Sequence, residues 1–406
     1  LIVFLGLLFV FLFRLNNSNN GVPTIKSFLN QDKLAAHKNL TYAIQVDKDM
    51  LLTADYCYLD GGIYNFANKN KNIYSYNINT EEVTLIVTAD NYISIDGIAS
   101  SKDWLVWIEV DNQVYDTSDK PFNWIMMAKD LNSGTQMQID KSEFTSNKYN
   151  VPMFVDYVPI SPKISDNNIL VYSKTIPNGN KIASELICYD LNTKIKKILD
   201  RTDDVTEEQI YSYCSIYDNT IAWSKFRQLN DYPYKRFTQY AYSDLYIYNL
   251  NTDEIDQLTY DDFFVEPAIY KNKLVAVRAP ENREDQDVFN SEIVLFDLKT
   301  KKFQTIVDEN SPVYLKREPT MYRTRPIINK NYISWQNTSG PNRYIYDYKK
   351  NRFLEIYENL EDCYRAPHIK DARIITLNMF DEYVLINAYH WVEEDIDVKS
   401  ELVKLP

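Results

Sequence analysis

Short strand-like runs of apolar and aromatic residues recur along the chain, and each run ends in a polar turn that is followed by another strand. The turn has the form Asp/Asn-Leu-Asn-Thr or a close variant. The copies start about 50–60 residues apart, at Ile73–Thr80, Ile125–Gly134, Leu186–Thr193, Leu245–Thr252, Ile293–Thr300, Tyr344–Asn351 and, more weakly, near Leu402. Short runs bounded by such turns predict β-strands, and repeats of this length are typical of propellers and solenoids.

A second pattern precedes these turns: a Pro-x-Ile strand or a relative of it, a polar turn, and an apolar strand with an aromatic residue. The copies are Ser161–Tyr172, Ile216–Trp223, Glu266–Val277, Arg325–Trp335, the weaker Gly97–Trp107 and Ala366–Leu377, and Tyr58–Tyr64 in the first repeat. Each copy predicts a β-hairpin. Two hairpins in each repeat give four strands, and we expect Trp107, Trp223 and Trp335 to pack between neighbouring sheets.

The combined pattern, which ends in a tyrosine-rich strand and Asp-Leu-Asn-Thr, resembles the TolB-like (PD40) β-propeller repeat over about Asp49–Pro406. The Ser-Pro-Asp-Gly turn of that repeat is replaced here by Asp-Asn, Lys-Asn or Asn-Lys-Asn. Together, the resemblance and the repeats predict an all-β fold, a seven-bladed β-propeller of four-stranded antiparallel blades. Because the motifs are degenerate, they specify the fold better than the function.

Glycine is scarce for an all-β protein, with 8 residues in 406, whereas tyrosine contributes 33 and phenylalanine 18. Aromatic and β-branched residues favour strands. We expect Asn and Asp to fill the left-handed turn positions that glycine usually takes, because they tolerate a positive φ angle better than other side chains do.

Two arrangements could complete the last blade of the ring. Segments around Ala366–Leu377 and Tyr383–His390 could supply three strands and Glu401–Pro406 a fourth. Alternatively, Thr41–Val46 could add the outer strand from the N-terminal side. We expect the N-terminal strand to close the ring, because joining the two ends covers strand edges that would otherwise be exposed.

The N-terminal segment Leu1–Phe13 is almost unbroken in its apolar character and is followed by Arg14 and the polar stretch Asn16–Asn20. This order predicts a signal peptide or a membrane anchor at residues 1–20, a linker at 21–40 and the propeller at 41–406. We therefore expect an exported protein at the cell surface, either membrane-anchored or secreted. The sequence leaves open whether the segment is cleaved.

The net charge of −13 argues against nucleic acid as a partner, which would require a basic surface. The four cysteines, Cys57, Cys188, Cys214 and Cys363, lack the close pairs of a zinc site. Free, buried thiols are the expectation. Disulfides Cys188–Cys214 and Cys57–Cys363 are the alternative.

Long connections are predicted at one rim of the propeller, at Val110–Asn123, Thr175–Ser184, Phe226–Ser243, Pro280–Ser291 and Trp391–Ser400. Loops on a rigid scaffold often carry binding sites. The candidate ligand-binding residues in the Phe226–Ser243 loop are Tyr232, Tyr234, Phe237, Tyr240 and Tyr242. The alternative is that these aromatic side chains fold over the rim and cover the core.

Charged residues recur at the strand ends that approach this rim. Lys174, Lys225 and Arg278 follow the second-strand aromatic or its equivalent, and Glu266, Arg325, Arg365 and His368 lie near the starts of first strands. They predict a mixed charged ring whose basic members could hold a carboxylate. A network of salt bridges between blades is the alternative.

These features predict a non-catalytic recognition or scaffold module that binds a protein, a peptide or a glycan through its loop-rich face. No catalytic residue, metal ligand or cofactor is predicted, because the chain has 3 His and lacks a Gly-x-Ser-x-Gly elbow. One alternative is a structural subunit of a cell-surface assembly. Another is a carbohydrate-active enzyme, a lyase or a glycosidase, that uses rim carboxylates from among Glu281, Glu284, Asp285, Asp287, Glu393, Glu394, Asp395 and Asp397.

Overall fold

The computed structural model describes residues 42–47, 50–54, 72–77, 79–80, 82–90, 94–110, 123–144, 161–211, 213–227, 242–279, 291–308, 310–311, 313, 323–337, 344–355, 375–379, 383–392 and 395–405. All regular elements in these segments are β-strands. No helix in this part of the chain is long and apolar enough to cross a membrane. The predicted N-terminal anchor and linker lie outside the described residues.

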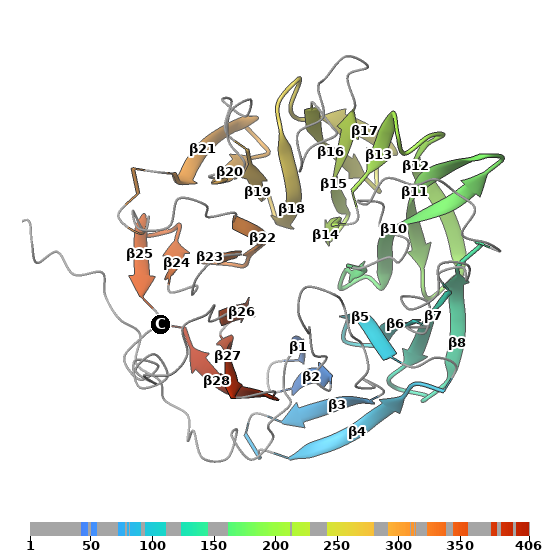
Figure 1. Ribbon diagram of the computed structural model, residues 1–406, viewed down its shortest axis with the longest axis vertical. Helices are drawn as coiled ribbons and strands as arrows, with labels where there is room; N and C mark the ends of the chain where they lie inside the picture. Colours follow the sequence, from blue (N-terminus) through green and yellow to red (C-terminus); the bar gives the residue numbers. More distant parts are fainter. Residues whose placement is uncertain are drawn as a thin grey trace, which may run out of the picture.

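The strands form seven antiparallel sheets that follow one another around a central axis, as Figure 1 shows. We number the sheets 1 to 7 in chain order. Sheet 1 contains β1 (Tyr42–Asp47), β2 (Met50–Ala54), β3 (Asn72–Asn77) and β4 (Val83–Thr88). Sheet 2 contains β5 (Ser94–Ser100), β6 (Trp104–Val110), β7 (Trp124–Asp130) and β8 (Gln136–Lys141). Sheet 3 contains β9 (Lys163–Ile164), β10 (Ile169–Asn178), β11 (Lys181–Asp190) and β12 (Ile195–Thr202).

The remaining sheets repeat this arrangement with small variations. In sheet 4, β13 (Glu208–Ile210) and β14 (Ser215–Tyr217) both pair with β15 (Thr220–Arg227), followed by β16 (Tyr242–Asn249) and β17 (Glu254–Gln257). Sheet 5 contains β18 (Phe264–Tyr270), β19 (Lys273–Arg278), β20 (Glu292–Asp297) and β21 (Lys302–Val307). Sheet 6 contains β22 (Arg323–Ile328), β23 (Tyr332–Asn337), β24 (Tyr344–Asp347) and β25 (Arg352–Glu355). Sheet 7 contains β26 (Ile375–Met379), β27 (Tyr383–Val392) and β28 (Asp395–Lys404).

Within each sheet the first strand lies nearest the axis and the last strand lies outermost (Figure 1). Because neighbouring strands are antiparallel, the turns between first and second strands and between third and fourth strands lie at one end of the ring. The connections between second and third strands and between sheets lie at the other end. The short turns are therefore separated from most of the long connections, as the sequence predicts.

The turns between third and fourth strands are built by side chains that bond to the backbone. The residue that opens the turn accepts hydrogen bonds from backbone N–H groups two and three residues further on, which is the geometry of an Asx turn. These residues are Asp130, Asp190, Asp297, Asp347 and Asn77, and Asn249 accepts the first of the two bonds. This explains why the Asp/Asn-Leu-Asn-Thr motif recurs.

The fifth residue of these turns adopts a left-handed conformation, with φ angles of 76°, 61°, 60°, 54° and 52° at Gly134, Lys194, Asp253, Lys301 and Asn351. The prediction that Asp and Asn supply such conformations is confirmed at Asp253 and Asn351. Lysine fills two of the other places. The turn therefore tolerates several residue types at a position where glycine has the least strain.

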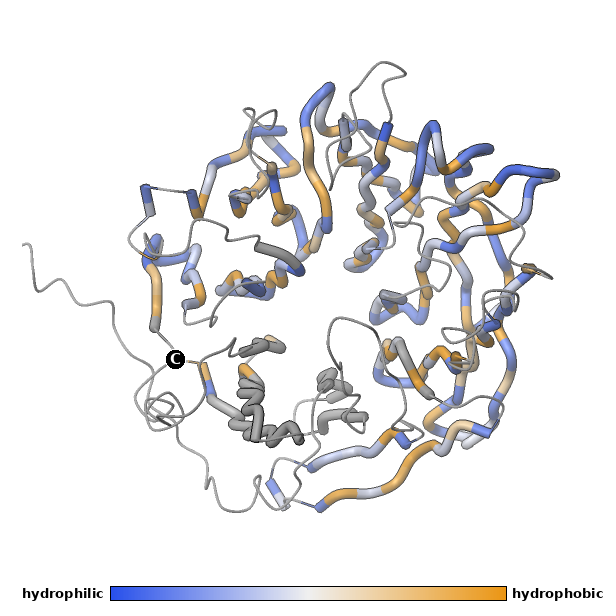
Figure 2. Tube along the Cα trace, in the orientation of Figure 1, coloured by the Kyte–Doolittle hydropathy of each residue, from blue (hydrophilic) through white to orange (hydrophobic). Residues whose placement is uncertain are grey.

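The hydrophobic core consists of clusters that lie between neighbouring sheets. Trp107, Trp223 and Trp335 are 1%, 0% and 3% exposed, and each belongs to a cluster that includes residues of the preceding sheet. Their predicted packing between sheets is thus confirmed. Figure 2 shows hydrophobic residues along the strands and hydrophilic ones at many of the turns. Cys188 and Cys214 share one such cluster and are both free thiols, as expected; Cys57 and Cys363 lie outside the described residues.

The prediction that the N-terminal strand closes the last blade is wrong. Strand β1 pairs with β2 as the innermost strand of sheet 1, and the described part of sheet 7 has three strands. Only residues 48–49 separate β1 from β2, so the local hairpin closes at a low entropic cost. Sheets 1 and 7 meet through contacts between β1 and β26.

Two predicted hairpins also differ from the structure. In sheet 1 the first hairpin is β1–β2, and Tyr58–Tyr64 lies outside the described residues. In sheet 7 the first hairpin is β26–β27, so part of the predicted copy Ala366–Leu377 belongs to the innermost strand. The region around β1 and β2 lacks the Pro-x-Ile signal, whereas in sheet 7 the signal at Pro367–Ile369 precedes the first described hairpin.

Two predicted long loops are mainly strand. Thr175–Ser184 belongs to β10 and β11, which pair through Asn178 and Lys181 around a tight turn. Its Gly179 has a φ angle of 64°, as two-residue hairpin turns require. Trp391–Ser400 lies largely in β27 and β28.

Candidate functional site: the inner rim

The innermost strands of sheets 4, 5 and 6 share an irregularity near the end that carries the long connections. The register shifts between Val265 and Ala268 in β18 and between Thr324 and Ile327 in β22. In sheet 4 the same place separates β13 from β14. Such β-bulges redirect a side chain and leave it outside the regular ladder.

The bulge residues occupy one position of the sequence repeat. Glu266 and Arg325 each precede a proline, which has no N–H group to donate to the ladder. In Tyr213-Cys214-Ser215-Ile216, Tyr213 holds the same place relative to the isoleucine. Glu266 and Arg325 have φ angles of 55° and 49°. A left-handed conformation at such residues costs about 1–3 kcal/mol and is often found at binding sites.

Glu266 is 4% exposed and joins three sheets. One carboxyl oxygen accepts a hydrogen bond from the Tyr211 hydroxyl at 3.3 Å, and the other accepts one from the backbone N–H of Arg325. Burial raises the pKa of Glu266 to about 7, although the Arg325 N–H, the charge of Arg325 and the Tyr211 hydroxyl act in the opposite direction. The carboxyl therefore changes charge near neutral pH.

Arg325 is exposed, and its guanidinium lies over the ring of Tyr213 at 5.5 Å from the ring centre. Its Nε also donates a hydrogen bond to the Tyr213 hydroxyl at 3.1 Å. Cation–π stacking and this bond orient the guanidinium without removing it from solvent. We call Tyr211, Tyr213, Glu266 and Arg325 the inner-rim cluster.

A row of aromatic rings connects the inner-rim cluster to the core. The ring centre of Tyr211 lies 5.3 Å from that of Tyr213 and 4.9 Å from that of Phe226. Phe226 lies 5.7 Å from Phe263, and both belong to the core cluster between sheets 5 and 6. The inner-rim cluster is therefore supported by aromatic rings that are packed into the core.

Comparisons with solved structures identify the fold. The propeller domain of the Trilobed protease from Pyrococcus furiosus, described as having an open velcro topology, aligns with 88% of this chain and 94% of its own, at 10% identity and a TM-score of 0.52. The acylaminoacyl peptidase of Pyrococcus horikoshii aligns with 91% of this chain at 11% identity and a TM-score of 0.50. The chain folds as a β-propeller.

The likeness extends to the fold alone, because identities are so low. The propeller spans about half of the acylaminoacyl peptidase chain, 54%. TolB from Acinetobacter baumannii is also similar, at 12% identity over 70% of this chain and 59% of its own, with a TM-score of 0.37. No family model matches the sequence, and no curated protein matches it either.

Of the predicted binding residues, the structure brings Glu266 and Arg325 together within the propeller. Sequence reasoning missed Tyr211 and Tyr213. The predicted hairpin copy Ile216–Trp223 begins three residues too late, because Cys214 replaces the proline of other repeats. Aligning Cys214 with Pro267 and Pro326 would have revealed Tyr213 as the equivalent of Glu266 and Arg325.

Lys174 lies away from the inner-rim cluster, in an ion pair between sheets 2 and 3. Its Nζ is 3.1 Å from Asp140 and 2.6 Å from Glu143, and its side chain is 2% exposed. Tyr172 donates a hydrogen bond to Asp140 at 2.7 Å. Burial alone would lower the pKa of Lys174, but Glu143 and Asp140 outweigh it and raise that pKa.

Lys225 repeats this arrangement between sheets 3 and 4. Its Nζ lies 3.3 Å from Asp200 on β12 and 3.7 Å from Glu208 on β13. Trp223 donates to Asp200 from its indole N–H at 3.1 Å. A second-strand aromatic residue and the cation two positions later thus share one aspartate of the preceding sheet in both cases.

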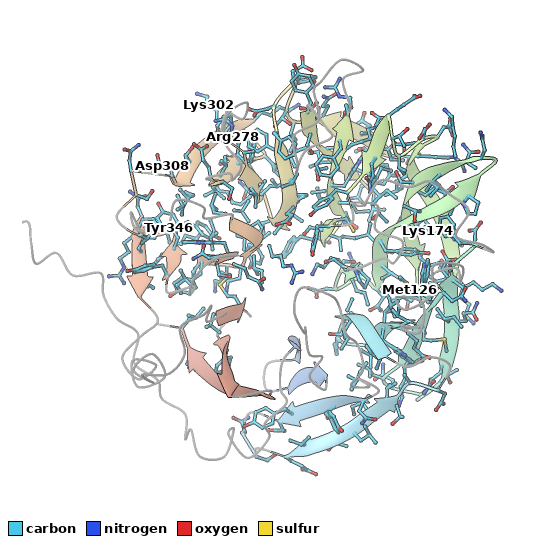
Figure 3. All side chains as sticks on the ribbon, in the orientation of Figure 1. Met126, Lys174, Arg278, Lys302, Asp308 and Tyr346 are labelled. Atoms are coloured by element: carbon cyan, nitrogen blue, oxygen red, sulfur yellow. The ribbon has the colours of Figure 1, made fainter. Side chains whose placement is uncertain are left out.

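Arg278 makes related contacts around sheet 5. Its guanidinium lies 2.9 Å from Asp262 and 3.7 Å from Glu292, and it stacks over Phe264 at 5.5 Å. Figure 3 shows Lys174 and Arg278 on separate parts of the ring. Inter-sheet ion pairs therefore account for Lys174 and Lys225, as the alternative interpretation holds, and Arg278 pairs with acidic residues within and beside its own sheet.

The remaining candidates cannot be placed at the inner rim from the structure. Tyr242 begins β16, where the Arg227 guanidinium lies 5.7 Å from its ring centre. The other candidates, Tyr232, Tyr234, Phe237, Tyr240, Arg365 and His368, lie outside the described residues. Within the described part, no three His, Cys, Asp or Glu residues gather as metal ligands.

Proposed function

We propose that this chain is an exported, non-catalytic recognition propeller of seven blades, which binds a protein, a peptide or a glycan at the loop-rich end of its axis. The seven described sheets support the number of blades. The apolar segment Leu1–Phe13 supports export and attachment to a membrane.

The observation that carries this proposal is the inner-rim cluster. Irregularities at the inner edge of three successive sheets bring Tyr213, Glu266 and Arg325 together, and Glu266 and Arg325 adopt left-handed backbone conformations there. Arg325 is exposed and stacked on a tyrosine, so it places a cation beside an aromatic surface, a combination enriched in protein interfaces. Such a surface suits a polar or anionic group of a ligand.

Binding is tested by exposing the purified chain to peptide and glycan arrays. We expect selective capture by the intact chain and a loss of about tenfold or more in affinity for Arg325→Gln, as removal of an interface arginine typically causes. Arg352→Gln is the matched control, because Arg352 begins β25 at the opposite end of the ring. Equal capture by Arg325→Gln and the intact chain would remove the inner rim from the binding site.

The same arrays separate recognition from catalysis. Captured ligands are recovered after long incubation and analysed by mass spectrometry, with and without a chelator. We expect intact ligands under both conditions. Recovery of cleaved or eliminated products would favour the carbohydrate-active enzyme instead.

Attachment to the membrane is tested by fractionating cells that express the full chain. We expect the protein in the membrane fraction, released by detergent and retained in alkaline carbonate. Recovery in the soluble cytoplasmic fraction would contradict the export part of the proposal.

A further inference from the structure

Glu266 and Arg325 are electrostatically coupled within the inner-rim cluster. The Glu266 carboxyl accepts the backbone N–H of Arg325, and the Arg325 charge acts on it through space. Arg325 is exposed, whereas Glu266 is buried. A ligand that meets Arg325 therefore changes the electrostatic environment of Glu266 without touching it.

Among the side chains that the structure describes, the other charged groups on the elements packed against β18 pair with residues other than Glu266. The elements packed against β18 are the β13–β14 segment, β15, β16, β19 and β22. Tyr211 donates a hydrogen bond to Glu266, and the ring of Tyr213 stacks on the Arg325 guanidinium. Tyr217 on β14 stacks on Tyr270. The charged side chains on the other strands pair with groups other than Glu266: Lys225 with Asp200 and Glu208, Arg227 with Asp244 and Asp261, Lys273 with Asp297, and Arg278 with Asp262 and Glu292.

We propose that a carboxylate-bearing ligand binds at Arg325 and that this binding is coupled to protonation of Glu266, so that the inner-rim cluster takes up a proton as the ligand binds. This inference rests on the proposed recognition function and adds the ligand's chemical class and its regulation by pH. The carboxylate could come from a peptide or from an acidic sugar, and the chemistry at Arg325 is the same for both.

The direction of the coupling follows from the charges. Arg325 lowers the pKa of Glu266, so an anion that neutralises Arg325 raises it again and draws a proton onto the carboxyl. By reciprocity, protonation of Glu266 strengthens anion binding by the same factor. Above neutral pH the negative charge of Glu266 repels an anionic ligand and weakens its binding at Arg325. Below neutral pH Glu266 is uncharged, so the attraction between Arg325 and the anion is no longer opposed.

The experiment measures affinity and proton uptake by calorimetry between pH 6 and 8, in buffers of different ionisation enthalpy. The probes are N-acetyl-Tyr-Phe with a free carboxylate, an alginate trimer, and the amide and methyl ester of each respectively. We expect at least one carboxylate probe to bind about tenfold more tightly at pH 6 than at pH 8, with net proton uptake. The neutral derivatives should bind weakly and show no pH dependence.

Two variants show which residue binds the carboxylate and which residue causes the pH dependence. Glu266→Gln should retain binding of the carboxylate probe and lose both the pH dependence and the proton uptake. Arg325→Gln should bind weakly throughout the pH range. If Glu266→Gln fails to fold, Tyr211→Phe serves instead, because removal of the hydroxyl bond to the carboxyl should move the midpoint of the pH dependence upward.

The outcomes separate this inference from the proposed function. Selective capture of neutral ligands alone, or unchanged pH dependence in Glu266→Gln, would overturn the inference and leave recognition intact. Absence of any selective capture by the arrays would overturn both. The peptide and alginate arms show which source of carboxylate the cluster prefers.

Discussion

At the scale of single residues, Glu266 differs from most other acidic residues that the structure describes on strands. Asp140, Asp200 and Asp244 each meet the side chain of a cation from a neighbouring strand. The Glu266 carboxyl instead accepts hydrogen bonds from a backbone N–H group and a tyrosine hydroxyl. Because these groups compensate burial only in part, Glu266 becomes a source of pH dependence in stability.

The pH dependence of unfolding tests this. Burial raises the pKa of Glu266 from 4.5 to about 7, so its neutral form favours the folded state. The contribution is fully present below about pH 4.5 and falls as the pH rises to about 7, by at most about 3 kcal/mol. In Glu266→Gln we expect a flatter curve of unfolding free energy between pH 5 and 7.5, measured by denaturant titration. The same slope in both proteins would contradict this role of Glu266.

Left-handed turn positions give a second prediction at this scale. Gly134 has a φ angle of 76° and open space around it, so Gly134→Ala should cost about 1 kcal/mol from backbone strain alone. Lys194 holds the same place in the next sheet, and Lys194→Gly should shift the denaturation midpoint by a smaller amount in the opposite direction. Midpoints that move in the same direction for both variants would refute this explanation.

At the scale of elements, sheets are joined by a repeated contact of an aspartate with an aromatic residue and a lysine. Asp140 accepts a hydrogen bond from Tyr172 and pairs with Lys174. Asp200 accepts a hydrogen bond from Trp223 and pairs with Lys225. The aspartate lies on the outermost strand of one sheet, and its partners lie on the second strand of the next. The contact therefore sets how neighbouring sheets align.

Substitution of the buried lysine tests the strength of this contact. Lys174→Ala leaves Asp140 with Lys196 and removes a side chain that is 2% exposed, so we expect a loss of about 2–3 kcal/mol in unfolding free energy. Lys196→Ala is the matched control, because Lys196 pairs with the same carboxylate from a side chain that is 36% exposed. Its loss should be below about 1 kcal/mol. Equal losses would show that burial of Lys174 does not matter.

The sequence predicts elements well where turn chemistry is local. The Asp/Asn-Leu-Asn-Thr motif locates the turns because a single side chain bonds to its own backbone nearby. Prediction fails where the information is distant, because Tyr213 approaches Arg325 across an intervening sheet. It also fails at β1, where the local hairpin with β2 forms in place of pairing with the last sheet. The local sequence at Tyr213 does not indicate that its partner is Arg325. The sequence predicts Glu266 and Arg325 as site residues because both are charged and lie near the starts of first strands, whereas their contact is visible only in the structure.

At the scale of the whole molecule, β1 matters because it lies in sheet 1 and also contacts β26 of sheet 7. A chain that starts at Asp49 would lose that contact and expose an edge of β2. We expect it to melt at a lower temperature than the full chain and to self-associate, as measured by calorimetry and size-exclusion chromatography. An unchanged melting temperature and size would show that β1 is dispensable for the ring.

The absence of a strand shared between β1's sheet and sheet 7, in the part of the chain that the structure describes, has a thermodynamic consequence. Sheets 1 and 7 meet through β1 and β26, and each sheet depends mainly on its immediate neighbours, as units of a linear array do. We expect unfolding to begin where sheets 1 and 7 meet and to travel in both directions, so amide protons in sheets 1 and 7 should exchange before those of sheets 3 to 5.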